Sequence, residues 1–312
     1  MAGKIAFVFP GQGSQTVGMG RALADAFPEA REIFERADDA LGEKLSALCF
    51  EGPEEALKLT ANTQPSILTV SVAAHAVLAK ALGRTPDFVA GHSLGEWSAL
   101  TAMGSMKVED AVRAVRKRGQ FMQEAVPAGQ GAMAAIIGLA PEQVRAACEE
   151  VAQGEVVAPA NYNSPEQTVI AGTAAAVERA SARCKELGAK RALPLPVSAP
   201  FHCALMAPVQ PRLKAVLTEM EIAAPAAPVV TNVEAAPNAD PARIAPLLVE
   251  QVVAPVRWIE CVQAMAAAGV THMVEVGPGK VLSGLVRRID KSIEMVNVED
   301  PASLEKALAA LA

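Results

Sequence analysis

The chain has 312 residues, of which 51% are hydrophobic and 20% charged, so it is long enough for two units with a substantial buried core. Its formal net charge of −6 argues against a nucleic-acid or other polyanion partner, and its 4% aromatic content disfavours a base-stacking surface. The five cysteines are widely spaced without a CxxC pair, which predicts neither a disulfide framework nor a zinc site.

The first predicted element is a short buried strand at residues 4–9, KIAFVF, which ends at a Pro-Gly pair and does not resemble a signal peptide. Helical patterns follow at about 20–48 and 64–82. The longest apolar stretch, 67–81, is interrupted by polar side chains, which predicts a buried helix and not a membrane span. We therefore expect a cytoplasmic protein without a membrane partner.

Another strand is predicted at 87–93, DFVAGHS, and a helix continues directly from it. Near the C-terminus, further strands are predicted at 228–233, 271–276 and 292–298, with helices between them. This alternation of strands and helices is typical of a mainly parallel sheet with both faces covered.

The pattern changes between residues 127 and 200, where the predicted elements follow the order βαββαβ. This order is typical of a ferredoxin-like unit. We therefore predict an α/β fold with an α/β-hydrolase-like core, made of residues 1–126 and 201–312, and an inserted ferredoxin-like subdomain at 127–200. The segments PAGQG (127–131) and SAPF (198–201) are the expected hinges.

The segment GHSLGEW, residues 91–97, allows two interpretations of Ser93. Ser93 and Glu96 form the S-x-x-E pattern of a helix capping box, and capping serines vastly outnumber catalytic ones. A cap does not require glycine on both sides, whereas G-x-S-x-G after a strand is typical of a nucleophile on a sharp strand-to-helix turn. A nucleophilic serine also needs a base, because its free hydroxyl is a poor nucleophile at neutral pH.

Among the four histidines, His202 is the best candidate base, since it lies in a loop after the last strand of the predicted subdomain, where the two units meet. His75 is expected to pack within a helix, His92 to point away from the turn, and His272 has no supporting neighbours. The acidic residues between Ser93 and His202 lie in helical patterns or turns, unlike the acid of a hydrolase triad. A backbone or amide carbonyl is therefore expected to orient His202.

Several segments occur in a characteristic order: GQGSQ (11–15), GHSLGE (91–96), RKRGQFMQ (116–123), NYNSP (161–165), PFHCALM (200–206), QVVAPVRW (251–258) and EVGPGKVLSGL (275–285). Together they resemble the malonyl-CoA:acyl carrier protein transacylase family over essentially the whole chain. The resemblance implies an acyltransferase that moves malonyl from malonyl-CoA to the phosphopantetheine thiol of acyl carrier protein through a malonyl-serine intermediate, for fatty acid synthesis. It implies no metal and no cofactor, since the coenzyme A thioester is a substrate.

The same resemblance implies individual roles. Ser93 would attack the thioester while His202 acts as general base. The carbonyl of Gln251 would hold the imidazole in place of an acid. The backbone N–H groups of Gln12 and Leu94 would form the oxyanion hole.

Arg118 lies in a basic run that is usually a solvated helix face. Helical spacing places it at the border of a buried stripe, which is formed by Val112, Val115, Gly119 and Met122. Arg113 and Lys117 are expected to point away from that stripe. A guanidinium at such a border can hold a carboxylate through two hydrogen bonds, and malonyl carries a carboxylate whereas acetyl does not. We expect Arg118 to select a carboxylated acyl group, without fixing its α-substituent.

Other functions are compatible with parts of this pattern. A serine hydrolase of the α/β class would use Ser93 and His202 with water as acceptor, although the missing acid and the inserted unit weigh against it. A non-catalytic carrier-binding module would be expected to lack one of the site residues, and all are present. An acidic carrier needs a locally basic surface. The candidates are Arg113, Arg116, Lys117, Lys190, Arg191 and Lys280.

Overall fold

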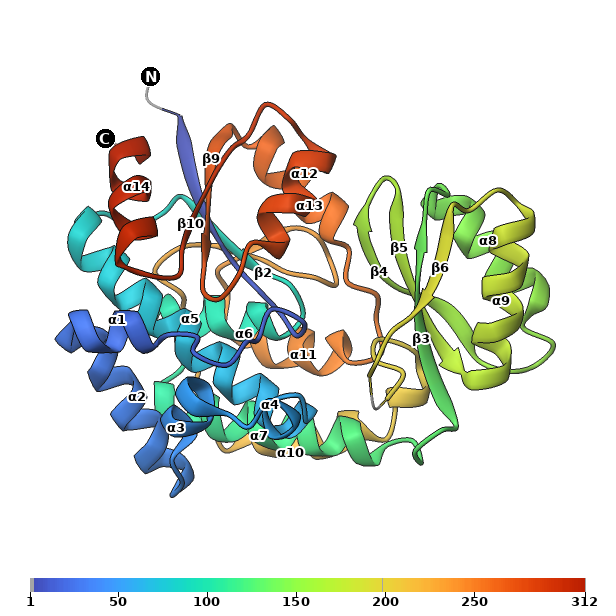
Figure 1. The fold of residues 1–312 in the computed structure, drawn as a ribbon, viewed down its shortest axis with the longest axis horizontal. Helices are drawn as coiled ribbons and strands as arrows, with labels where there is room; N and C mark the ends of the chain where they lie inside the picture. Colours follow the sequence, from blue (N-terminus) through green and yellow to red (C-terminus); the bar gives the residue numbers. More distant parts are fainter. Residues whose placement is uncertain (1–2, 198, 312) are drawn as a thin grey trace.

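The computed structural model describes residues 3–197 and 199–311, which form a large unit and a small unit (Figure 1). Each unit has its own sheet, six-stranded in the large unit and four-stranded in the small one. The hinge expected at 198–201 begins at Ser198, which lies outside the described residues. The α/β class with a mainly parallel sheet is confirmed.

The sheet of the large unit has the strand order β10-β9-β1-β2-β7-β8. Its strands are β1 (Lys4–Phe9), β2 (Phe88–Gly91), β7 (Val229–Val230), β8 (Pro237–Asn238), β9 (Val270–Val276) and β10 (Glu294–Val298). Neighbouring strands are parallel except for β7 and β8. The strand predicted at 228–233 is shorter than expected, because the chain turns back at Thr231, whose carbonyl accepts the N–H of Ala235.

The sheet is buried on both faces, which explains why β1 is a continuous apolar run. Phe7 and Phe9 lie in the core on one face, beneath the long helix α5 (Thr60–Leu82). Ala6 and Val8 lie on the other face, against α12 (Trp258–Ala267) and α13 (Val281–Ile289). Successive side chains of a strand point to opposite faces, so this one segment contributes to both cores.

The remaining helices of the large unit are α1 (Arg21–Ala26), α2 (Pro28–Leu41), α3 (Leu45–Glu51), α4 (Glu54–Leu57), α6 (Leu94–Ala102), α7 (Val108–Glu124), α10 (Val209–Thr218), α11 (Pro241–Gln251) and α14 (Pro301–Leu311), with a 3₁₀ turn at Ala204–Met206. The helical pattern predicted at about 20–48 is therefore divided among three helices, so a single continuous helix there is not formed. Pro28 begins a new helix at its first position, and Gly42 ends that helix in the left-handed conformation with φ 66°.

Helix α5 is the central helix of the large unit. Among the described residues it is the one helix long and apolar enough to cross a membrane, but 72% of its apolar window is buried inside the fold. The prediction of a buried core helix in this region is confirmed.

The small unit has the antiparallel strand order β4-β5-β3-β6. Its elements are β3 (Gly131–Ile137), α8 (Pro141–Val151), β4 (Val157–Ser164), β5 (Gln167–Thr173), α9 (Ala174–Glu186) and β6 (Arg191–Pro194). Strand β4 also joins the large unit, because the Tyr162 N–H donates to the Val256 carbonyl at 2.9 Å and the Val256 N–H donates to Ala160. This junction joins the free edge of β4 to the segment of the large unit that precedes α12.

Candidate active site

Ser93 lies on the turn between β2 and α6, with the unusual backbone angles φ 52° and ψ −104°. Its Oγ lies 2.7 Å from Nε2 of His202, although the residues are far apart in the chain. The Ser93 side chain makes no capping hydrogen bond, and the Glu96 carboxylate accepts from Asn232 and Gln251 instead. The capping-box interpretation is therefore wrong, and the hydroxyl points to an imidazole.

Glycines make this turn possible by close backbone packing. A Cβ on Gly91 would lie 1.9 Å from the carbonyl carbon of Gly95, and a Cβ on Gly95 would lie 2.0 Å from the Phe9 carbonyl oxygen. A Cβ on Gly11 would lie 2.3 Å from the His92 carbonyl oxygen. These glycines let the loop after β1 and the Ser93 turn pack directly against each other, as the G-x-S-x-G pattern requires.

His202 is buried and held by backbone carbonyls. Its Nδ1 lies 2.8 Å from the Gln251 carbonyl oxygen and 3.2 Å from that of Ala254. Because a carbonyl only accepts, Nδ1 carries the proton and Nε2 is left as an acceptor for the Ser93 hydroxyl. Burial, and then the charge of Arg118, lowers the pKa of His202 from 6.5 to about 3, so the imidazole is neutral at physiological pH.

The other histidines and Cys203 are occupied elsewhere. His75 packs against the rings of β1, and His272 lies on β9, beside Glu294 of the neighbouring strand β10. His92 lines the same cavity as Ser93, contrary to expectation, but its Nε2 is 2.8 Å from Asn163 Oδ1. Burial raises the pKa of the Cys203 thiol to about 11, so this cysteine is not an activated nucleophile.

Arg118 is only 1% exposed, which is more buried than its predicted place at the border of a stripe. Its Nη2 donates to Ser93 Oγ at 3.1 Å and to Gln251 Oε1 at 3.0 Å, and its Nη1 donates to Gln64 Oε1 at 2.8 Å. Gly119 allows this position, since a Cβ there would lie 2.7 Å from the Thr60 carbonyl oxygen. Burial lowers the pKa of Arg118 to about 10, which leaves it charged at neutral pH.

Gln12 and Leu94, whose backbone N–H groups are the expected oxyanion donors, belong to the same site. Both residues line the cavity that contains Ser93 and His202. Within the described parts of the chain, neither N–H donates a hydrogen bond to a protein acceptor. Two free N–H groups beside a serine hydroxyl can stabilise a negative oxygen that develops there.

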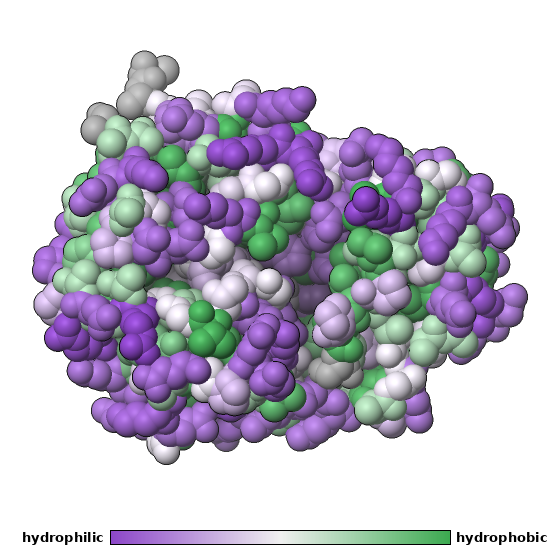
Figure 2. Space-filling view, in the orientation of Figure 1, coloured by the Kyte–Doolittle hydropathy of each residue, from purple (hydrophilic) through white to green (hydrophobic). Residues whose placement is uncertain are grey.

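The cavity around Ser93 has a volume of about 100 Å³ and lies between the two units, where the surface is hollowed (Figure 2). Its apolar wall comes mainly from α7 and the small unit, through Met122, Met133, Leu195, Val197 and Phe201. Asn161 of β4 completes the lining. This space is narrow, partly apolar, and contains a buried cation next to a hydroxyl.

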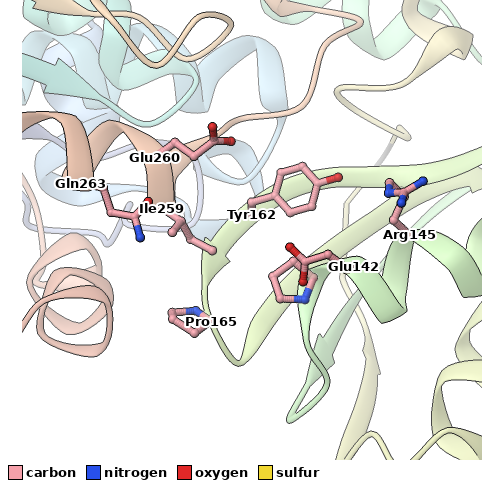
Figure 3. Close-up of a pocket in the computed structure, with 8 residues that line it drawn as sticks. Glu142, Arg145, Tyr162, Pro165, Ile259, Glu260 and Gln263 are labelled. Atoms are coloured by element: carbon pink, nitrogen blue, oxygen red, sulfur yellow. The ribbon is translucent and has the colours of Figure 1, made fainter.

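A larger cavity of about 470 Å³ lies between the small unit and α12. Figure 3 shows Glu142, Arg145 and Tyr162 of the small unit facing Ile259, Glu260 and Gln263 of α12. None of the described residues that line this cavity is a serine, cysteine or histidine. Chemistry therefore favours the smaller cavity as the active site, despite its size.

Sequence reasoning missed polar groups that support the Ser93 turn. Asn232 accepts the Ser93 N–H through Oδ1 at 2.7 Å and donates Nδ2 to the Gly91 carbonyl at 2.7 Å. Gln64 holds Arg118, and Glu96 holds Gln251. Asn232 was detectable in principle, because it follows a strand of the parallel sheet at its carboxyl end, where ligand sites form.

The chain is similar to known proteins over nearly its whole length. A family model described as an acyl transferase domain matches residues 6–305. A protein of Escherichia coli (strain K12) named malonyl CoA-acyl carrier protein transacylase is 52% identical over 305 residues, which cover 98% of this chain and 99% of that protein. The crystal structure of an acyl carrier protein S-malonyltransferase from Vibrio cholerae is 52% identical, with a TM-score of 0.95 and coverage of 97% and 99%.

A second similar structure is a complex of a type II PKS acyl-carrier protein with its malonyl-transacylase. It is 50% identical to this chain, with a TM-score of 0.96, and the match covers 98% of this chain and 99% of that one.

Proposed function

This chain is an acyltransferase of the malonyl-CoA:acyl carrier protein transacylase family, and we propose that it transfers malonyl from malonyl-CoA to acyl carrier protein through a malonyl ester of Ser93. The observation that carries this proposal is the 2.7 Å contact between Ser93 Oγ and His202 Nε2, beside the guanidinium of Arg118 at 3.1 Å. Malonyl-CoA and the carrier protein are the proposed partners, and fatty acid synthesis is the proposed use of the product.

In the first half-reaction, Ser93 Oγ attacks the thioester carbonyl carbon and its proton passes to His202 Nε2. The carbonyl oxygen becomes negative and accepts hydrogen bonds from the N–H groups of Gln12 and Leu94. The C–S bond then breaks, and His202 returns the proton to the coenzyme A thiolate. Malonyl remains on Ser93 as an ester.

In the second half-reaction, the carrier's phosphopantetheine thiol gives its proton to His202 and attacks the ester carbonyl. The C–O bond breaks and Ser93 takes the proton back. The carbonyl of Gln251 holds the imidazole through both halves. Every proton moves between groups of this chain and the substrates, so the proposed cycle includes no metal and no cofactor.

Arg118 is the proposed partner of the malonyl carboxylate. Its hydrogen-bond partners among the described residues, Gln64, Gln251 and Ser93, are all neutral, so a carboxylate would add a charged contact partner. The cavity of about 100 Å³ is smaller than the roughly 300–1,000 Å³ of pockets that enclose larger ligands. It suits a short acyl group while the carrier remains outside.

The fold supports a finer proposal. The nucleophile turn after a parallel strand is typical of an α/β-hydrolase-like core, and the βαββαβ order of the small unit is typical of a ferredoxin-like subdomain. We propose both descriptions, together with a cytoplasmic location.

The proposal predicts that coenzyme A release from malonyl-CoA continues only when carrier protein is present. We expect one equivalent of coenzyme A per enzyme without the carrier, and continuous release with holo-carrier. A carrier without phosphopantetheine is the matched control and should give no turnover. Continuous release without any carrier would instead indicate a hydrolase, with water as the acceptor.

A pH profile tests the assignment of His202 as a buried neutral base. Only the neutral imidazole can accept the serine proton, and a pKa lowered to about 3 keeps it neutral throughout the range from pH 7 to pH 5. We expect the single-turnover rate of Ser93 acylation to change by less than about threefold over this range. A base with an ordinary pKa of 6.5 would lose about 30-fold at pH 5, with a midpoint near 6.5. Circular dichroism at pH 5 is the control for folding.

A further inference from the structure

The Glu96 carboxyl is buried close to the active site, without a role in the steps above. It is 2% exposed and lies one turn of α6 beyond Ser93. A single oxygen, Oε2, accepts from the Asn232 backbone N–H at 2.9 Å and from Gln251 Nε2 at 2.8 Å. Burial raises the pKa of Glu96 to about 7. A buried carboxyl is costly, so its presence beside the site calls for a reason.

Glu96 reaches Arg118 through the side-chain amide of Gln251. The amide donates Nε2 to Glu96 and accepts Arg118 Nη2 through Oε1 at 3.0 Å. An oxygen acceptor at Glu96 keeps the amino group on its side and turns the amide oxygen toward Arg118. With the amide reversed, the Gln251 amino group would face the guanidinium, and two donors would oppose each other.

The other acceptors near Gln251 Nε2 are weaker. The Ser93 carbonyl lies at 3.2 Å and Asn232 Oδ1 at 3.4 Å. Both already accept other donors, the Glu96 N–H and the Ser93 N–H respectively. The bond to Glu96 is therefore the main restraint on the orientation of this amide.

We propose that Glu96 is a positioning residue for acyl selection, which fixes the Gln251 amide so that Arg118 is held ready for the malonyl carboxylate. This inference rests on the proposed function and deepens it. Through Asn232, Glu96 also supports the Ser93 turn, but that support serves every acyl donor equally. The contribution through Gln251 serves only donors that use the guanidinium.

Substitution of Glu96 can separate a hydrogen-bond role from a charge role. The Asn232 N–H and Gln251 Nε2 both donate to the same oxygen of Glu96, and a neutral glutamine has one such oxygen in the same place. Glu96→Gln therefore keeps the acceptor and removes the charge, whereas Glu96→Met removes both at similar volume.

The test measures kcat/KM for malonyl-CoA and acetyl-CoA in each variant. We expect Glu96→Met to lower the malonyl-to-acetyl ratio by about tenfold, as typical for loss of a restraint on a charged hydrogen-bond partner. We expect Glu96→Gln to keep the ratio within about threefold of wild type. Glu275→Met is the matched control, because Glu275 is a fully buried carboxyl that accepts from Leu282 and Ser283, away from Arg118. Its ratio should stay at the wild-type value.

An equal loss of kcat/KM for malonyl-CoA and acetyl-CoA in Glu96→Met would overturn the inference. A change of the malonyl-to-acetyl ratio in Glu96→Gln as large as in Glu96→Met would also overturn it. If Glu96→Met does not fold, Gln251→Met serves instead, because it removes the amide and keeps the backbone carbonyl that holds His202. An unchanged ratio in Gln251→Met would also overturn the inference. Failure of the proposed function is separate, since wild-type enzyme would then not transfer malonyl to the carrier.

Discussion

Replacement of Ser93 with alanine is expected to abolish formation of the malonyl-enzyme and to lower kcat by about 10⁴- to 10⁶-fold. Among the described residues, the hydroxyl is the only group placed to donate to His202 Nε2, at 2.7 Å, and also to accept from Arg118. Without it, the neutral imidazole has no proton to remove and the acyl group has no oxygen to join. The measurement is intact-protein mass spectrometry after incubation with malonyl-CoA, followed by peptide mapping.

Ser98→Ala is the matched control for this experiment. Ser98 lies in the same helix and is fully buried, and its Oγ has no hydrogen-bond partner in the described structure. We expect this variant to be labelled at the wild-type rate, on the peptide that contains Ser93. A malonyl label on the Cys203 peptide, or a full label on Ser93→Ala, would contradict the proposed intermediate.

The sequence predicts the nucleophile turn and its base because their signals are local or ordered along the chain. Glycines on both sides of Ser93 predict a sharp turn, and the structure explains them by backbone approaches that leave no room for a Cβ. The sequence predicts His202 as the base because it lies in a loop after the last strand of the small unit, where the two units meet. The lack of an acid predicts a carbonyl partner, and the structure has one at Gln251.

The supporting network could not be predicted in the same way, because its members meet only after folding. Glu96 matches the capping-box spacing, yet its carboxylate bonds to α11 and to the loop after β7. Gln64 and Arg118 lie on different helices that approach closely at Gly119. Periodicity predicts which side of α7 is buried, but it does not say that a charged residue at the border becomes fully enclosed.

Removal of the guanidinium at Arg118 is expected to lower the ratio of kcat/KM for malonyl-CoA to that for acetyl-CoA by about 10²- to 10³-fold. Arg118→Met is the suitable change, because methionine fills part of the buried space and carries no charge. The variant also loses the hydrogen bond from Arg118 to Ser93 Oγ. This loss slows the reaction with malonyl-CoA and with acetyl-CoA alike, so it cancels in the ratio. Arg118→Lys keeps the charge but lacks the planar guanidinium that can donate two parallel hydrogen bonds, so it should retain part of the preference for malonyl-CoA.

Lys117→Met is the control, since Lys117 is the preceding residue of the same helix and is exposed. It should leave the ratio unchanged, because a solvated charge contributes little to a buried site. Arg118→Met that still prefers malonyl as strongly as wild type would exclude the guanidinium as the carboxylate partner. If the ratio falls mainly because acetyl transfer rises, the guanidinium acts chiefly against acetyl. In wild type, the unfavourable free energy of a buried guanidinium without a charged partner in the acetyl complex would then exceed the favourable free energy of its pairing with malonyl.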